Sequence, residues 1–276
     1  MSTGTGDRLA SELLPSWGML RDRTRRIILE VFVPILALIA LWDALAIVLG
    51  DPNTLPRPVM TFETTVTVAL TEDFHGLTGI DHLQYSLRRA VLASLLALAA
   101  SVAVGVLMTT SRPFEKGLSS LLPFAMTIPT VVIILLSMVW FGFNERGVII
   151  AVVIASTPFG IVNMWQGAQD IDTDLITMAQ SFEASTAQLW RDVYVPHLLP
   201  YIFGSYRYVF GMVWKIVVLG EVFGLQEGLG TRFRYHYQIG EIESVLAYLM
   251  LFVIVILVVE YVVLKPVEAY AFKWKD

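Results

Sequence analysis

Residues 90–108 form an apolar stretch without a single charged side chain. At ~1.5 Å per residue, a helix of this length crosses most of the ~30 Å hydrocarbon core of a bilayer. The composition of the whole chain agrees, since 56% of its 276 residues are hydrophobic, only 16% are charged and the mean hydropathy is +0.67. The sequence therefore predicts an all-α integral membrane protein.

Five further stretches are long and apolar enough to cross a membrane. Together with the first they predict six spans, at residues 27–49, 90–108, 118–143, 148–165, 201–222 and 245–264. Pro123 and Pro129 predict a kink or a non-spanning turn in the third span. We accordingly divide the chain into an N-terminal segment (1–26), a six-span domain (27–264) and a C-terminal tail (265–276).

The distribution of Lys and Arg predicts the orientation of these spans. With both termini in the cytoplasm, the inner segments carry eleven of these residues and the outer segments carry six. An excess of positive charge marks the cytoplasmic side of a membrane protein. We therefore expect a multi-pass protein of the cell membrane, with both termini and residues 166–200 inside and residues 51–87 and 223–244 outside.

Several classes of function are excluded by what the sequence lacks. It contains no cysteine, its four histidines follow no metal-ligand spacing, and neither a phosphate loop nor a G-x-S-x-G motif occurs. The net charge of −5 has the wrong sign for binding nucleic acid. We therefore expect no catalytic residue, bound metal or cofactor in this chain.

Two connections between spans are too long to be simple turns. In residues 51–87, Val59, Phe62, Val66 and Ala69 recur at helical spacing, which predicts a short amphipathic helix on the membrane face. The second long connection is residues 166–200, and its polar sequence predicts two short helices.

The first of these two helices has one apolar face, made by Leu175, Ala179 and Phe182. The second is predicted to begin at a capping box of Ser185 and Gln188. We expect Pro196 to end it, and Glu183 and Ala184 to form the corner between the two helices. A polar elbow of this kind is suited to being held by a cytoplasmic partner.

The elbow resembles the E-A-A-x3-G-x9-I-x-L-P motif of the membrane subunit of binding-protein-dependent ABC importers. The spacing is kept, with Thr177, Met178 and Ala179 at the first three motif positions and Val193, Tyr194, Val195 and Pro196 at the last four. Glu183 stands where the family has a glycine. A left-handed backbone at a non-glycine residue costs on the order of 1 kcal/mol, so either the corner is right-handed or it stores strain.

Within that family the chain looks like the branch that imports nitrate, sulfonates, taurine and related small solutes. The matching pieces are LPRP (55–58), HLQYSLRR (82–89), VWFG (139–142), Gly204, Arg207 and Gly211, GE (220–221) and GLG (228–230).

The resemblance implies a type I importer permease that works as a homodimer or a heterodimer of such subunits, most simply a homodimer. It also implies two separate ATPase subunits, which bind ATP and Mg²⁺ and dock on the elbows, and an external solute-binding protein. In that arrangement Leu175, Ala179, Phe182, Glu183, Ala184, Ser185, Gln188 and Pro196 are the residues that couple transport to the ATPase.

The fifth span carries Arg207, Lys215 and Glu221, which are costly in lipid. One stripe of its helix is predicted to face a central solute path, and it comprises Arg207, Gly211, Trp214, Val218 and Glu221, with Lys215 on the flank. Alternatively, Arg207 and Glu221 lie near the two membrane interfaces and Lys215 pairs with another span.

Two other classes of protein compete with the importer. A self-sufficient secondary transporter predicts inverted repeats and discontinuous spans, and a membrane-embedded enzyme needs converging catalytic groups. The sequence shows no internal repeat and no converging catalytic groups, and the prolines of the third span are the breaks that it offers. The solute itself stays open between small oxyanions or sulfonates and vitamin-precursor pyrimidines or other small organic molecules.

Overall fold

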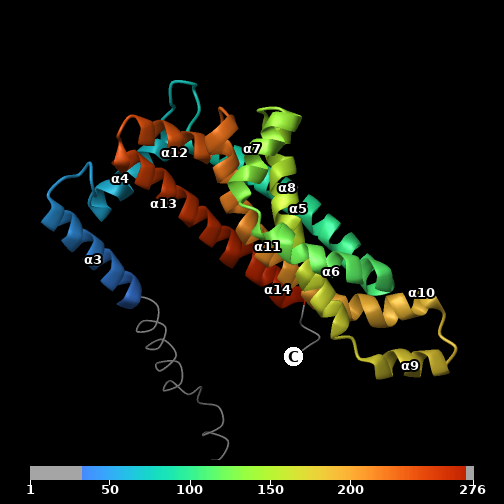
Figure 1. Cartoon of the computed structure of the whole chain (residues 1–276). Helices are drawn as coiled ribbons and strands as arrows, with labels where there is room; N and C mark the ends of the chain where they lie inside the picture. The colour runs from blue at the N-terminus through green and yellow to red at the C-terminus, as the bar shows by residue number, and fades with distance from the viewer. Residues whose placement is uncertain (1–32, 272–276) are drawn as a thin grey trace, which may run out of the picture. The chain divides into compact units, whose positions relative to one another are not determined.

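The structure, a computed structural model, describes residues 33–271, and every regular element in that range is helical (Figure 1). The α-helices are α3 (Val33–Leu49), α4 (Pro58–Leu70), α5 (Gly79–Thr110), α6 (Arg112–Thr127), α7 (Thr130–Phe141), α8 (Glu145–Gln169), α9 (Thr173–Ser181), α10 (Thr186–Leu189), α11 (Val195–Gly224), α12 (Leu229–Gln238), α13 (Ile242–Val258) and α14 (Lys265–Ala271). Two π-helical turns, η2 (Trp190–Tyr194) and η3 (Val259–Leu264), join α10 to α11 and α13 to α14. The chain divides into two units, residues 1–61 and 62–276.

The first unit contains α3, whose side chains are almost all apolar and exposed. Two polar contacts fold the following loop back onto this helix. The indole N–H of Trp42 donates to the carbonyl oxygen of Pro56 at 3.0 Å, and Arg57 forms a two-bonded ion pair with Asp43 at 2.8 and 2.9 Å. The beginning of the predicted first span, residues 27–32, lies outside the described residues.

The second unit has its core where α5, α8 and α11 pack together. Small side chains make this close packing possible, and Ala90, Ala93 and Ala97 of α5 have no exposed surface. A Cβ atom on Gly160 of α8 would lie 2.2 Å from the Ser101 hydroxyl oxygen of α5. The small residues of the predicted second span therefore serve helix contact, as expected for helices that associate in lipid.

The predicted third span is broken into α6 and α7, which meet at an angle of 95°. Ile128 adopts an extended conformation directly before Pro129, because a proline disfavours the helical conformation of the residue preceding it. Pro123 lies inside α6. The proline-induced bend predicted from the sequence is thus confirmed, and Pro129 is its location.

The predicted end of the second elbow helix at Pro196 is wrong. Helix α10 passes through η2 into α11, and the helical run continues from Thr186 to Gly224. Pro196 falls in the first turn of α11, where its missing N–H is tolerated, and the π-helical turn immediately before it accommodates the change in hydrogen bonding. His197 follows Pro196 in this helix, and its Nε2 lies 3.2 Å from the carbonyl oxygen of Gly167.

The count of six spans stays a prediction, because residues 27–32 of the predicted first span lie outside the described residues. Among the described residues, four helices are long and apolar enough to cross a membrane, or five if the bent pair α6–α7 is counted as one span. Helix α3 has only 17 described residues. The amphipathic helix expected after it exists as α4, with Val59, Phe62 and Val66 exposed, and residues 265–271 of the predicted tail continue the last span as α14.

Candidate functional site

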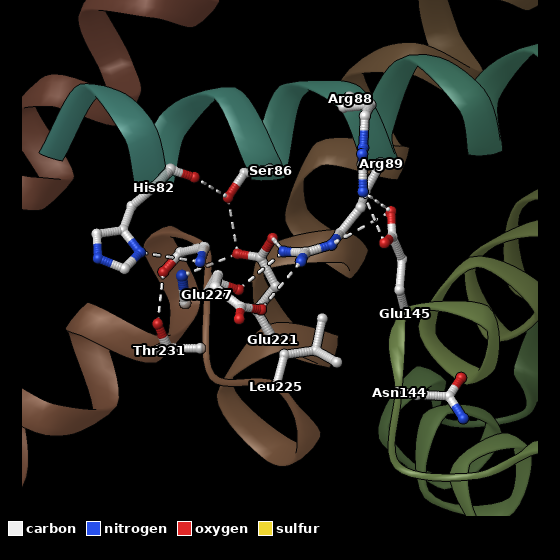
Figure 2. A network of polar contacts seen from close by, with 12 residues as sticks. His82, Ser86, Arg88, Arg89, Asn144, Glu145, Glu221, Leu225, Glu227 and Thr231 are labelled. Atoms are coloured by element: carbon white, nitrogen blue, oxygen red, sulfur yellow. Dashed lines mark hydrogen bonds and ion pairs between the residues drawn. The ribbon is translucent and has the colours of Figure 1, made fainter. Parts of the chain in front are cut away.

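The start of α12 is held by side chains from two other helices (Figure 2). A helix leaves its first N–H groups without partners inside the helix. The N–H groups of Gly228, Leu229 and Gly230 donate to His82 Nδ1 at 3.1 Å, Ser86 Oγ at 2.9 Å and Glu221 Oε2 at 3.0 Å. We call this arrangement the α12 clamp, and it comprises His82, Ser86, Arg89, Glu221 and the backbone of residues 228–230.

The carboxylate of Glu221 is the centre of the clamp and has no exposed surface. It accepts hydrogen bonds from Arg89 Nη1 at 2.8 Å, from the Ser86 hydroxyl at 2.8 Å and from the Gly230 N–H. Arg89 is also buried, at 2% exposure. A buried ion pair is tolerated when hydrogen bonds satisfy its remaining polar atoms, and this carboxylate meets that condition.

Two glycines give the carboxylate its space. A Cβ atom on Gly228 would lie 2.3 Å from the carboxyl carbon of Glu221, and one on Gly230 would lie 2.1 Å from the carbonyl oxygen of Val218. Gly228 also has a φ of +117°, a conformation that other residues rarely adopt. The G-L-G sequence is therefore required here by close approach and by backbone geometry.

Arg89 extends the network to further acidic groups. Its Nη1 also donates to the carbonyl oxygen of Glu227 at 2.8 Å, and carboxylate oxygens of Glu227 and Glu145 each lie 3.8 Å from its other nitrogens. The neighbouring Arg88 pairs with Glu145 at 2.7 Å. The beginnings of α5 and α8, the end of α11 and the start of α12 are thus joined at one end of the second unit.

His82 connects the clamp to the loop before α5. Because its Nδ1 accepts the Gly228 N–H, its Nε2 carries the proton and donates to Asp73 Oδ2 at 3.0 Å. Arg232 of α12 pairs with the same carboxylate. Burial by itself would raise the pKa of the Asp73 carboxyl, but the Leu77 N–H, His82, the His75 N–H and Arg232 outweigh it and hold that pKa below its usual range.

A signal for the clamp is present in the sequence, although none of the predictions made from the sequence included it. His82, Ser86 and Arg89 are spaced i, i+4 and i+7, which places the three polar side chains on one face of the helix. Three pieces of the family resemblance (82–89, 220–221 and 228–230) all meet in the clamp.

The predicted stripe of α11 is not one exposed surface. Trp214 is fully buried, with its ring against Phe210 and Phe252 at centroid distances of 6.0 and 5.5 Å. Glu221 is buried in the clamp, Val218 is half-buried, and Arg207 pairs with Glu260 of η3 and, at 3.0 Å, with Glu268 of α14.

The exposed residues of this face are Arg207, Gly211 and Lys215, and of these Gly211 and Lys215 make no polar side-chain contact in the described part of the chain. Nothing lies within 4 Å of a Cβ atom built on Gly211, and in the described part of the chain the Lys215 ammonium has no ion-pair or hydrogen-bond partner. The alternative was that Lys215 pairs with another span, and residues 33–271 contain no such pair. The assignment of these residues to a solute path stays a prediction.

The elbow has the predicted two helices and corner, at α9 and α10. Asp172 caps α9, and Ser185 and Gln188 form the expected capping box of α10. Leu175 and Phe182 are exposed, at 46% and 81%, while Ala179 is half-buried. The role of the elbow in coupling stays a prediction.

Glu183 is left-handed, with a φ of +59°, and it is the only non-glycine residue with positive φ in the described chain. The N–H of Ala184 donates to the carbonyl oxygen of Ala179 at 3.0 Å, and the N–H of Glu183 donates to that of Gln180 at 2.9 Å. These two bonds define a Schellman motif, in which glycine usually occupies the left-handed position. Of the two possibilities left open by the sequence, the structure selects the strained corner.

Comparisons with known proteins agree with the resemblance seen in the sequence. A family model described as "Binding-protein-dependent transport system inner membrane component" matches residues 96–264. A putative ABC transporter permease protein of Methanocaldococcus jannaschii is 28% identical over 93% of this chain and 95% of its own length.

Two similar proteins have names that state a solute. The putative aliphatic sulfonates transport permease protein of Bacillus subtilis is 26% identical over 87% of this chain and 85% of its own length. The taurine transport system permease protein of Escherichia coli is 28% identical over 75% of each chain.

A solved structure supports the fold. A chain of the MetNI methionine ABC transporter in an inward-facing conformation matches with a TM-score of 0.61 and 18% identity, over 70% of this chain and 95% of that one. Family model, relatives and fold agree. This multi-pass chain belongs to the binding-protein-dependent transport system inner membrane component family, and it is the permease component of an ABC transporter.

Proposed function

We propose that this permease imports a small anionic solute, of the oxyanion, sulfonate or taurine-like class, by alternating access. In this proposal an external binding protein delivers the solute, a second copy of the permease completes the path, and two ATPase subunits dock on the elbows. The names of the sulfonate and taurine relatives support the solute class. The single observation that carries the proposal is the charge of Lys215, which is exposed and has no ion-pair partner among residues 33–271.

Lys215 lies in the interior of a spanning helix, ~21 Å by helix rise from Tyr201, where the predicted fifth span begins. A lysine at such depth costs roughly 2.5–3.5 kcal/mol in lipid. The other cation of α11, Arg207, is neutralised by two carboxylates. The exposed ammonium group of Lys215, next to Gly211 with its missing side chain, can be hydrated and can bind a passing anion. Weak binding at this position allows the anion to be released.

The proposed orientation places the elbow and both termini in the cytoplasm and the α12 clamp outside. Polar contacts in the second unit occur in two separate groups, which agrees with one group on each side of the membrane. The clamp gathers one set of helix ends, whereas Tyr201 bonds Asp170 at 2.9 Å and Trp165 bonds Glu115 at 3.1 Å near the elbow. Because the chain has no cysteine, Ser185→Cys provides a unique label site. Labelling of that site by an impermeant reagent from outside intact cells contradicts the orientation.

The solute proposal is tested with the complete complex, purified from membranes and reconstituted in vesicles. Uptake of taurine, ethanesulfonate and nitrate is measured for wild type, Lys215→Met and Lys215→Arg. We expect Lys215→Met to reduce uptake at least tenfold with assembly intact, and Lys215→Arg to keep much of it. Lys116→Met is the matched control, because Lys116 is also exposed on a helix but lies on α6.

Two outcomes contradict parts of this proposal. Unchanged anion uptake by Lys215→Met removes Lys215 from the path. If mass spectrometry of the isolated complex instead finds a bound pyrimidine or another uncharged solute, the anion class is wrong and the vitamin-precursor alternative is favoured. Uptake by the isolated chain without any ATPase would favour a secondary transporter.

A further inference from the structure

The α12 clamp joins three helices through groups that are far apart in the sequence. Its long-range bonds connect α5 with residues 132 to 146 positions later in the chain. Every bond involves at least one buried side chain, and Arg89 and Glu221 are 2% and 0% exposed. The clamp therefore has the character of a core rather than of a surface contact.

We propose that the clamp keeps α12 fixed to α5 and α11 as one rigid body throughout the transport cycle. Ser86 and Glu221 are then positioning residues, which fix α12 and touch no solute. The inference deepens the function proposed above and rests on it, because it concerns a complex that turns over.

The buried charges of the clamp disfavour every state in which α12 separates from α5 and α11. Moving α12 away would remove the Gly230 N–H from the Glu221 carboxylate and the acceptors from the Gly228 and Leu229 N–H groups. Buried donors and charges that lose their partners are expensive, so separating α12 from α5 and α11 carries a large free-energy cost. An element that has to open is built from weakly held contacts, and the clamp has the opposite construction.

The connection between α12 and α13 is less tightly packed than the clamp. Gly240 has a φ of +78°, nothing lies within 4 Å of a Cβ atom built on it, and its neighbour Glu241 is exposed. Relative motion at this end of the subunit is therefore expected at the turn around Gly240, on the far side of α12.

Hydrogen exchange measured by mass spectrometry on the complete complex tests this inference. The amides of residues 228–230 are compared in the resting complex and during steady ATP hydrolysis, with those of residues 239–241 as the reference. We expect the clamp amides to exchange at least about 100-fold more slowly than the reference amides in both states. A tenfold or larger loss of clamp protection during hydrolysis overturns the rigid body.

Ser86→Ala separates a positioning role from a merely structural one. It removes the acceptor of the Leu229 N–H without removing a charge, and Ser94→Ala is the control, because the Ser94 hydroxyl bonds the carbonyl of Val91 in its own helix. With taurine, ethanesulfonate or nitrate as the solute, whichever wild type carries, we expect Ser86→Ala to lower the number of molecules moved per ATP at least threefold.

The outcomes of this second test separate the two proposals. An unchanged ratio of solute to ATP in Ser86→Ala, with raised exchange at residue 229, overturns the positioning role and leaves the importer function standing. A wild-type complex that hydrolyses no ATP contradicts the proposed function and the clamp inference together.

Discussion

Replacing Glu221 with glutamine tests how the clamp is stabilised. In the native subunit all three donors, Arg89, Ser86 and Gly230, point at the carboxylate. A glutamine amide keeps the shape but offers one oxygen and one NH₂ group. If the NH₂ group faces Arg89, it meets a guanidinium, and if it faces the other side, it meets the Gly230 N–H. Either orientation places a donor against a donor.

The expected magnitude follows from these contacts. Losing the charge-assisted bond to Arg89 costs about 1.5–3 kcal/mol, and a buried donor left without an acceptor costs about 1–3 kcal/mol. The retained bond from Arg89 to the Glu227 carbonyl offsets part of this. We therefore expect Glu221→Gln to lower the free energy of unfolding by about 3 kcal/mol.

The free energy of unfolding is measured in detergent by titration with a denaturing surfactant, with tryptophan fluorescence as the signal. Glu227→Gln is the matched control. Its carboxylate lies 3.8 Å from the same Arg89 but is 44% exposed, so its loss is expected to change stability by less than about 0.5 kcal/mol. If Glu221→Gln is within about 0.5 kcal/mol of wild type, the carboxyl is not the charged acceptor we describe.

Three further changes test other parts of the structure. Gly230→Ala should cost about 3 kcal/mol of unfolding free energy, because its Cβ meets the Val218 carbonyl at 2.1 Å, whereas Gly204→Ala has open space and should be neutral in the same titration. A carboxylate whose pKa is lowered in the folded protein stabilises the fold above its unfolded pKa of about 3.9, and this contribution is lost as the pH falls through the folded pKa. Below about pH 4 the wild type should therefore lose more stability than Asp73→Asn does. Equal pH profiles of the two proteins would contradict the role of Asp73. Glu183→Gly should leave thermal stability unchanged or raise it by up to about 1 kcal/mol, and a clear loss would show that the left-handed corner is not strained.

Local features of this protein were predictable because they depend on neighbours in the sequence. The apolar stretches placed the helical spans, Pro129 placed the bend, and Ser185 with Gln188 placed the start of α10. The motif spacing also located the corner at Glu183. The error at Pro196 arose because a proline in the first turn of a helix looks the same in sequence as a proline that ends one.

The α12 clamp was decided by tertiary structure. The sequence shows polar residues on one face of α5, but it does not show which groups those residues meet. Glu221 appeared to belong to a solute path because helical spacing fixes only the face of its own helix, and the choice of partner depends on how α5, α8 and α11 pack. Buried polar groups must find partners wherever the fold brings them, here more than 130 residues away, and that distance is the physical reason why the sequence alone could place the helices but not the clamp.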